Sequence, residues 1–313
     1  MIYQQPLAYL LGLEGLALLH AYAGEYDREF AEARIAEIRR LLDTAALGEG
    51  VAATPVSTVD GYRAWSASYD QPRNTLFDVD EPIVHDILEP LPAGTALDAG
   101  CGTGRYAEYL AAHGHRVIGV DSSAEMLDRA RARVPAADFR LGDLHRLPVG
   151  DDEVDLVVSA LALTHVPDLA PVIAEFARVL HPGGHLVIAD VHHAHIELGS
   201  VPKMRTPEGQ PGLLPAHRHL LGDYLAAALP LGLRPLRCAE PLGTAREGPP
   251  VPPAEQITPG PWDDWPWSLL EIVPAAAQAA WHQTPLLIIW HFQLEDDSAA
   301  ANSAEASARS ACA

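Results

Sequence analysis

The stretch Thr95-Ala-Leu-Asp-Ala-Gly-Cys-Gly-Thr-Gly-Arg105 decides the fold of this chain. Its first residues are apolar, as in a central parallel strand, and Asp98 is expected to end that strand. The glycines Gly100, Gly102 and Gly104 permit a sharp turn and let the backbone approach a ligand where a Cβ would block it. Thr103 is predicted to cap the following helix. The spacing is G-x-G-x-G and not the G-x-G-x-x-G of a dinucleotide site, so the motif needs support from the rest of the chain.

Strands and helices alternate after this turn. The apolar runs predict strands over residues 95–97, 115–120, 137–141, 154–160 and 185–189, and helices over residues 122–134 and 169–180. A further helix over 219–231 and strands over 233–238 and 285–294 complete the pattern. This βαβ order predicts an α/β fold with a doubly wound, mostly parallel sheet.

The segment before the sheet is expected to be a helical cap or lid over residues 1–90. One leucine-rich helix is expected to end at Gly24, and a second helix is expected over residues 26–42. Their apolar faces need a partner surface, and three interpretations stay open: a cap on the sheet domain, a homodimer contact or a membrane role. The apolar run of residues 7–19 is shorter than a membrane span and contains Glu14, which argues against a transmembrane helix or a signal peptide.

The sheet domain is predicted to cover residues 91–295. Two insertions interrupt it, over about 191–215 and 241–274, and the second contains nine prolines and three tryptophans. Such segments are usually functional, and we expect both to form substrate walls. The Ala-, Ser- and acid-rich tail of residues 296–313 is predicted to be disordered.

Composition excludes several classes of function. The net charge is −21, which repels phosphate backbones, so we expect no nucleic-acid partner. The three cysteines have neither zinc-site nor disulfide spacing, which favours a cytoplasmic location. Lys203 is the only lysine among many arginines, and with abundant Ala and Pro this bias suggests a bacterial GC-rich genome.

Acidic residues follow three successive predicted strands. Asp98, Asp121 and Asp143 should share the carboxyl edge of the sheet, where ligands bind in such folds. Asp121 could accept both ribose hydroxyls, Asp143 an adenine amino group, and Asp98 could face an ammonium group. The glycines are not followed by G-K-[ST], so a nucleoside triphosphate is not expected.

These features together resemble the class I S-adenosylmethionine-dependent methyltransferases that modify small molecules. The resemblance rests on six motifs in order, covering residues 96–105, 117–127, 142–148, 154–158, 163–166 and 178–186. It extends from about residue 62 to 190 and more weakly to 292. It implies a seven-stranded Rossmann-like sheet with a reversed last strand, and S-adenosyl-L-methionine as cofactor.

The resemblance also implies which residues meet the cofactor. Asp98, Gly100 and Gly102 should hold its methionine part, Asp121 its ribose, and Tyr69 should lie over it from an N-terminal helix. The complete expected cofactor set is Tyr69, Asp98, Gly100, Gly102, Thr103, Gly104, Asp121, Ser122, Met126, Gly142, Asp143, Leu144, Ala160 and His165.

Histidines and aromatic residues are the candidates for the methyl acceptor. His192 and His193 follow a strand at the active edge and could accept a proton from a hydroxyl acceptor. Aromatic side chains could form a wall for a flat acceptor, and the expected substrate set is Trp65, His195, Trp262, Trp265 and Trp267. Asp190 with the nearby histidines lacks a second carboxylate ligand, so no metal is expected.

The sequence therefore predicts an enzyme of secondary metabolism that methylates O, N or C of a small, aromatic or natural-product acceptor by in-line displacement. Two alternatives remain: a regulatory or scaffold protein that binds the cofactor without turnover, and a nucleotide-binding oxidoreductase on the same sheet.

Overall fold

A computed structural model describes residues 1–66, 69–70, 74–243 and 257–296. The chain divides into two compact units, each made of three segments. One unit comprises Met1–Ser57, Ala194–Pro215 and Leu242–Pro285, and the other Thr58–His193, Ala216–Pro241 and Leu286–Ala313. We call them the insertion unit and the sheet unit. The predicted tail covers residues 296–313, and all of it except residue 296 lies outside the described residues.

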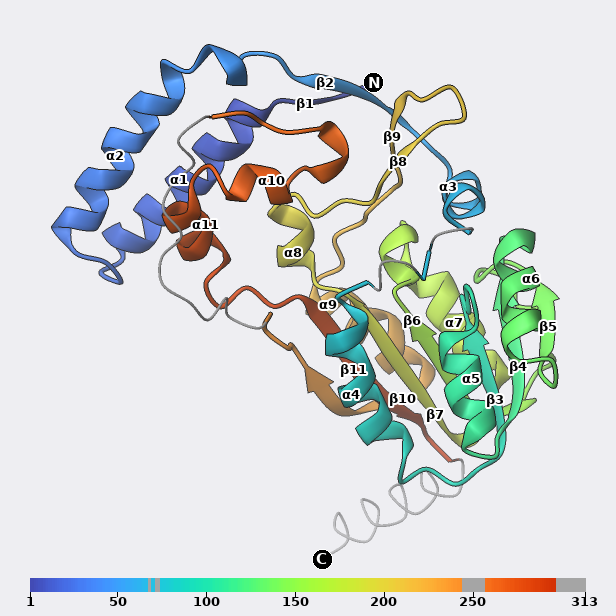
Figure 1. Cartoon of the computed structure of the whole chain (residues 1–313). Coiled ribbons are helices and arrows are strands. Elements are labelled where there is room, and N and C mark those ends of the chain that lie inside the picture. Colours follow the sequence, from blue (N-terminus) through green and yellow to red (C-terminus); the bar gives the residue numbers. More distant parts are fainter. Residues whose placement is uncertain (67–68, 71–73, 244–256, 297–313) are drawn as a thin grey trace, which may run out of the picture. The chain divides into compact units, whose positions relative to one another are not determined.

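The sheet unit contains a seven-stranded sheet in the order β10-β11-β7-β6-β3-β4-β5 (Figure 1). Its strands are β3 (Thr95–Ala99), β4 (Arg116–Asp121), β5 (Asp138–Leu141), β6 (Val154–Ala160), β7 (Leu180–Val191), β10 (Leu233–Ala239) and β11 (Leu287–Leu294). The first five are parallel, and β11 runs antiparallel to both β7 and β10. The predicted Rossmann-like sheet with a reversed last strand is therefore confirmed.

Helices cover both faces of this sheet. One apolar cluster joins the sheet to α7 (Leu169–Val179) and α9 (Leu221–Ala228). The other joins it to α4 (Phe77–Leu88), α5 (Arg105–Ala112) and α6 (Ala124–Arg133). Buried apolar residues at helical spacing in α7, such as Val172, Ile173 and Phe176, show why that segment is helical. A short helix, α3 (Thr58–Trp65), precedes α4.

The insertion unit contains a second sheet that the sequence did not predict. Its order is β1-β2-β9-β8, formed by β1 (Ile2–Gln4), β2 (Val51–Pro55), β8 (Lys203–Arg205) and β9 (Pro211–Leu213). Its helices are α1 (Pro6–Tyr22), α2 (Arg28–Leu42), α8 (His193–Glu197, which begins at the unit boundary), α10 (Trp267–Leu270) and α11 (Pro274–Trp281). One apolar cluster spans all three segments of the unit, from Leu10 through Leu213 to Ala276.

The division into units differs from the boundary at residue 90 that we expected. Helices α3 and α4 belong to the sheet unit, while both predicted insertions supply parts of the unit built on α1 and α2. The physical reason is the shared apolar core, which joins segments far apart in the chain. Short single-turn 3₁₀ helices, Ala45–Leu47, Leu163–His165, Leu229–Leu231 and Trp262–Asp264, connect several of these elements.

The starts of two helices differ from the prediction. The residue before α5 is Gly104, with φ of +84° and no side-chain cap, so Thr103 does not cap this helix. Helix α6 was expected to begin at residue 122 but begins at Ala124, and it is capped by Ser123, whose hydroxyl accepts from Met126 N. In both cases the helix begins later than the pattern suggested.

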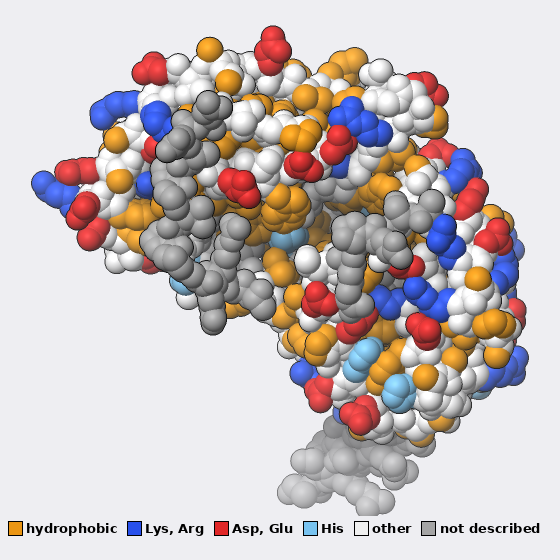
Figure 2. All heavy atoms as spheres, in the orientation of Figure 1, with side chains coloured by type: hydrophobic (Ala, Val, Ile, Leu, Met, Phe, Trp, Pro, Cys, Tyr) orange, Lys and Arg blue, Asp and Glu red, His pale blue; other side chains and the backbone are white. Residues whose placement is uncertain are grey.

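The surface of the viewed face carries acidic and basic side chains interspersed over both units (Figure 2). Among the described residues, no helix has both the length and the apolar character needed to cross a bilayer.

Candidate cofactor site

A small cavity lies at the carboxyl end of β3. Six predicted cofactor residues line it: Tyr69, Asp98, Gly100, Gly102, Thr103 and Ala160. Its remaining lining, which sequence reasoning missed, is Phe77, Cys101, Arg105, Tyr106 and Leu161. The glycine turn and the end of β6 therefore meet at one site, as the parallel pairing of β3 with β6 requires.

Glycine is needed in this turn for two separate reasons. Gly100 and Gly102 have φ of +76° and +52°, a backbone region that other residues rarely adopt. A Cβ at Gly102 would meet no atom within 4 Å, so this position borders open space. The turn thus leaves room for a ligand to approach the backbone.

Asp98 is a buried carboxyl group at this cavity, with 2% of its surface exposed. Its Oδ2 accepts a hydrogen bond from Ala107 N at 2.8 Å. Burial raises the pKa of Asp98 to about 7, although the amide of Ala107 and the charge of Arg105 act in the opposite direction. A cationic group bound here would stabilise the ionised carboxylate.

Asp121 supports the glycine turn from the end of β4. Its carboxylate accepts from Gly102 N and from Ser123 N, both at 2.8 Å. Burial raises the pKa of Asp121, and these backbone donors lower it only in part. The Asp121 side chain therefore links the ends of β3 and β4, which carry the predicted motifs of residues 96–105 and 117–127.

The third strand-end carboxylate, Asp143, lies beyond β5 and is exposed. Its Oδ1 accepts from His145 N at 2.8 Å and lies 2.6 Å from His145 Nδ1. Asp98 lies near the end of β3, Asp121 ends β4 and Asp143 follows β5, and these three strands are adjacent and parallel, so the three carboxylates share one edge of the sheet. The predicted common edge is confirmed.

The other expected cofactor residues lie around this edge but do not line the small cavity. Gly104 packs against α6, where a Cβ would come within 3.1 Å of Ala130. Met126 is fully buried, and Leu144 packs against the core that includes α7. Ser122 and Gly142 directly follow β4 and β5.

Polar contacts tie the segment of Tyr69 and Asp70 to the glycine turn. Asp70 Oδ1 accepts from the Thr103 hydroxyl at 3.0 Å, and Asp70 Oδ2 accepts from Arg133 Nη2 at 2.9 Å. Arg133 Nη1 also donates to Thr103 Oγ1 at 3.1 Å. Three side chains from three different segments thus form a closed triangle of hydrogen bonds beside the cavity.

A buried ion pair forms another part of the cavity wall. Arg105 Nη2 donates to Asp80 Oδ2 at 2.7 Å and Nη1 donates to Asp80 Oδ1 at 2.9 Å. The guanidinium group also lies over the ring of Phe77, 4.1 Å from its centre. Helix α4 is thereby fixed against the start of α5.

His165 bonds to a tyrosine that the sequence did not single out. A hydrogen bond of 2.8 Å joins His165 Nε2 to the Tyr62 hydroxyl, and the Tyr62 ring lies 5.7 Å from that of Tyr69. Burial raises the pKa of Tyr62 well above its usual value, so this hydroxyl stays protonated. Tyr69, Tyr62 and His165 therefore form a continuous row of side chains leading from the cavity.

The two candidate bases directly follow β7, which lies two strands from β3 in the sheet. His192 is 4% exposed, and its Nε2 lies 2.9 Å from Oε1 of Glu240, which follows β10. The ring of His193 lies 4.4 Å from that of His192. The contact with Glu240 joins the end of β7 to the segment after β10, and neither histidine lines the cavity beside the glycine turn.

The three tryptophans of the second insertion divide into two kinds. Trp262 and Trp265 are core residues, 4% and 6% exposed, and their indole N–H groups donate to Gln4 Oε1 and Pro259 O. They therefore do not form the exposed wall that we expected. Trp267 is 52% exposed and has aromatic neighbours in its own unit.

Those neighbours are His195 and Trp281. The His195 ring lies 6.3 Å from the Trp267 ring and 5.0 Å from the Trp281 ring. Trp281 was not predicted, because a single tryptophan at the end of a helix carries no local signal of its neighbours. Trp65 packs edge-on against Tyr62, at 5.3 Å, and lines neither of the two cavities described here.

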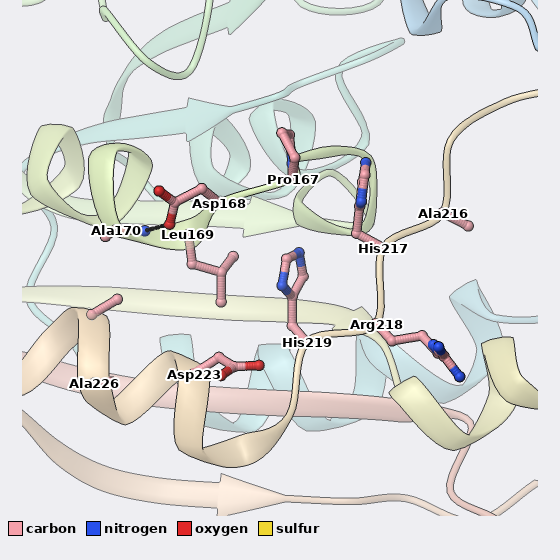
Figure 3. A pocket seen from close by; sticks show the side chains of 11 residues that line it. Pro167, Asp168, Leu169, Ala170, Ala216, His217, Arg218, His219, Asp223 and Ala226 are labelled. Atoms are coloured by element: carbon pink, nitrogen blue, oxygen red, sulfur yellow. Dashed lines mark hydrogen bonds between the residues drawn. The ribbon is translucent and has the colours of Figure 1, made fainter.

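A second cavity of about 680 Å³ lies between the turn before α7 and the start of α9 (Figure 3). Its histidines come from the segment before α9, and Asp168 comes from the turn before α7. His219 Nε2 donates to the carbonyls of Leu163 and Val166, which fixes the ring against the turn after β6. None of the predicted site residues lines this cavity.

Within residues 1–66, 69–70, 74–243 and 257–296, no group of three or more His, Cys, Asp or Glu side chains is placed to hold an ion.

Comparison with known families decides the identity of this site. Residues 97–188, which contain the glycine turn and the strand ends just described, match the family described as "Methyltransferase domain". This segment of the chain is therefore a methyltransferase domain of the class I S-adenosylmethionine-dependent type.

Curated relatives are similar to about a third of this chain. A malonyl-acyl-carrier-protein O-methyltransferase of Yersinia pestis is 41% identical over 104 residues, which is 33% of this chain and 39% of the relative. Methyltransferase GfsG of Streptomyces halstedii is 41% identical over 115 residues, or 34% of this chain and 41% of the relative. The chain thus spans less than half the length of these relatives.

A solved structure supports the fold of this chain. A putative methyltransferase in complex with the Trm112 activator of Haloferax volcanii has a TM-score of 0.51 and 24% identity, covering 75% of this chain and 98% of that one. At this identity the comparison establishes the fold alone.

Proposed function

We propose that the protein transfers a methyl group from S-adenosyl-L-methionine to a small, aromatic or natural-product acceptor. The single observation that carries the proposal is the cavity where Asp98, the glycine turn and Tyr69 meet. The residues present fit this cofactor, because a buried carboxyl suits its ammonium group and an open glycine position suits close backbone contact.

Each part of the cofactor has a proposed partner in the chain. Asp98 with Gly100 and Gly102 would hold the methionine part, Asp121 the ribose hydroxyls, and Asp143 with Leu144 the adenine edge. Tyr69 and Ala160 would cover the methionyl side. When bound, the cofactor supplies a methyl group on a positively charged sulfur. The chain's own residues bind it, orient it and exclude water.

The acceptor class is proposed from an aromatic group of the insertion unit that includes the exposed Trp267. Trp267 lies beside Trp281 and the buried His195, and an exposed indole face suits a flat, apolar molecule. The relatives named above act, by their printed names, as methyltransferases, one of them on oxygen of a malonyl group. A panel of phenols, indoles and malonyl-carrier-protein thioesters tests the acceptor, with transfer of labelled methyl as the readout.

Cofactor binding is tested by replacing the proposed ribose ligand. Asp121→Ala should weaken the affinity for S-adenosylhomocysteine by roughly 10- to 100-fold, because it removes a charged acceptor and releases Gly102 N. Isothermal titration calorimetry measures the affinity, with exposed Asp128→Ala on α6 as the control. Unchanged affinity in Asp121→Ala would contradict the ribose assignment.

The base assignment to His192 and His193 also stays a proposal. The carboxylate of Glu240 would orient His192 and stabilise its protonated form. Once an acceptor is known, His192→Gln should lower kcat and flatten the acid limb of the pH–rate profile. An unaltered profile would show that the acceptor loses its proton without this histidine.

A further inference from the structure

The strongest unassigned feature is the triangle of Asp70, Thr103 and Arg133. Thr103 belongs to the glycine turn and is 3% exposed, whereas Arg133 is the last residue of α6. Asp70 directly follows Tyr69, which lines the cofactor cavity. The triangle therefore connects an aromatic side chain of the cavity to two elements of the nucleoside-binding edge.

Charge explains why this triangle can hold its shape. The Arg133 guanidinium donates from one terminal nitrogen to Asp70 and from the other to Thr103. The Thr103 hydroxyl accepts from Arg133 and donates to the remaining oxygen of Asp70. Each bond to an ionised group is stronger than a neutral one, and each side chain limits the motion of the other two.

Resting on the proposed function, we propose that Asp70, Thr103 and Arg133 form a clamp that fixes Tyr69 over the bound cofactor. Arg133 does not line the cavity, so it is a positioning residue and acts through Asp70. The backbone of Asp70, held at this point, limits where the neighbouring Tyr69 ring can lie. The clamp slows cofactor release more than it affects the overall fold.

Arg133→Gln tests the clamp in the full chain, with S-adenosylhomocysteine as the probe. S-adenosylhomocysteine has no net charge, so loss of the arginine charge should have only a small long-range electrostatic effect on its binding. We expect dissociation about five- to tenfold faster by stopped-flow fluorescence, with a matching loss of affinity by calorimetry. The control is Arg129→Gln, an exposed arginine on the same helix, which should leave both values unchanged.

A double-mutant cycle separates positioning from general support. If Arg133 acts through Tyr69, then adding Arg133→Gln to Tyr69→Ala should change the dissociation rate of S-adenosylhomocysteine little beyond the effect of Tyr69→Ala alone. Additive effects of the two changes would overturn the clamp. Thr103→Ser should keep slow dissociation, whereas Thr103→Val should lose it, because only the serine retains a hydroxyl group.

The outcomes distinguish the clamp from the proposed function. If the wild-type protein does not bind S-adenosylhomocysteine, the proposed function fails. If it binds and Arg133→Gln dissociates at the wild-type rate, the clamp fails and the function stands. Should Arg133→Gln not fold, Asp70→Asn replaces it, since this change keeps the shape and removes the charge. An unchanged rate in Asp70→Asn also overturns the clamp.

Discussion

At the scale of single residues, Asp98 has the environment with the clearest chemical consequence. It lies buried beside the glycine turn, with one backbone amide donor and no cation bonded directly to it among the contacts described. Its pKa is raised to about 7 by burial, so about half of these groups are protonated near neutral pH. A bound ammonium group requires the ionised form.

This environment predicts pH-dependent cofactor binding. Because the folded pKa is raised, the carboxyl is mostly neutral at pH 6 and mostly ionised at pH 8. The affinity for S-adenosylhomocysteine should therefore rise about tenfold from pH 6 to pH 8. Calorimetry at both pH values measures this, and Asp98→Asn should bind weakly with little pH dependence. A wild-type affinity that does not change with pH would remove Asp98 from the ammonium site.

At the scale of secondary-structure elements, β7 and β11 carry a pair of histidines in contact. His185 Nδ1 lies 2.9 Å from His291 Nε2, an arrangement that needs one nitrogen without a proton. Burial, with the charges of His185 and Arg237, lowers the pKa of His291 to about 4. Burial also lowers the pKa of His185. The antiparallel pairing of these strands thus favours neutral imidazoles.

Acid should therefore weaken the sheet unit through this pair. Since the folded pKa of His291 is below its ordinary value of 6.5, the contribution to stability is complete above pH 6.5 and is lost as the pH falls toward 4. We expect His291→Gln to lose less stability than the wild type between pH 7 and pH 4.5, by on the order of 1–2 kcal/mol after solvent screening. Urea unfolding followed by circular dichroism measures the difference, and parallel pH curves for both proteins would refute it.

At the scale of the whole molecule, each unit has a core of its own. The cluster around Trp262 and Trp265 contains residues of the insertion unit, and the two clusters around the large sheet contain residues of the sheet unit. Lys203, the sole lysine of the chain, lies over the Trp262 ring at 4.9 Å, at the edge of the cluster that contains Trp262 and Trp265. Separate cores allow one unit to loosen while the other stays folded.

Trp262→Ala tests this independence. The change removes a buried indole and should cost about 3–5 kcal/mol of stability in the insertion unit. Limited proteolysis should then cut within residues 1–57 or 257–285 more rapidly, while the affinity for S-adenosylhomocysteine stays within about twofold. Exposed Trp267→Ala is the matched control and should leave the cleavage rate unchanged. Loss of cofactor binding in Trp262→Ala would show that the two units unfold together.

The strands of the large sheet and the carboxylates at their ends could be predicted from the sequence. Continuous apolar runs, such as Leu156-Val-Val158, and glycines that need positive φ are local signals, and each reflects forces within a few residues. The parallel arrangement of those strands followed from the general rules for βαβ units, whereas their order came from the tertiary structure. The chemistry implied by Asp98 and Asp121 therefore follows from residue type and spacing along the chain.

Only the tertiary structure decided which distant side chains meet. It placed Trp262 and Trp265 in a core with residues of the N-terminal helices, and it joined Asp70 to Arg133 and His192 to Glu240. It also built a second sheet from β1, β2, β8 and β9. These arrangements depend on burial and pairing between segments separated by as many as 258 positions in the chain, for which a local sequence pattern has no signal.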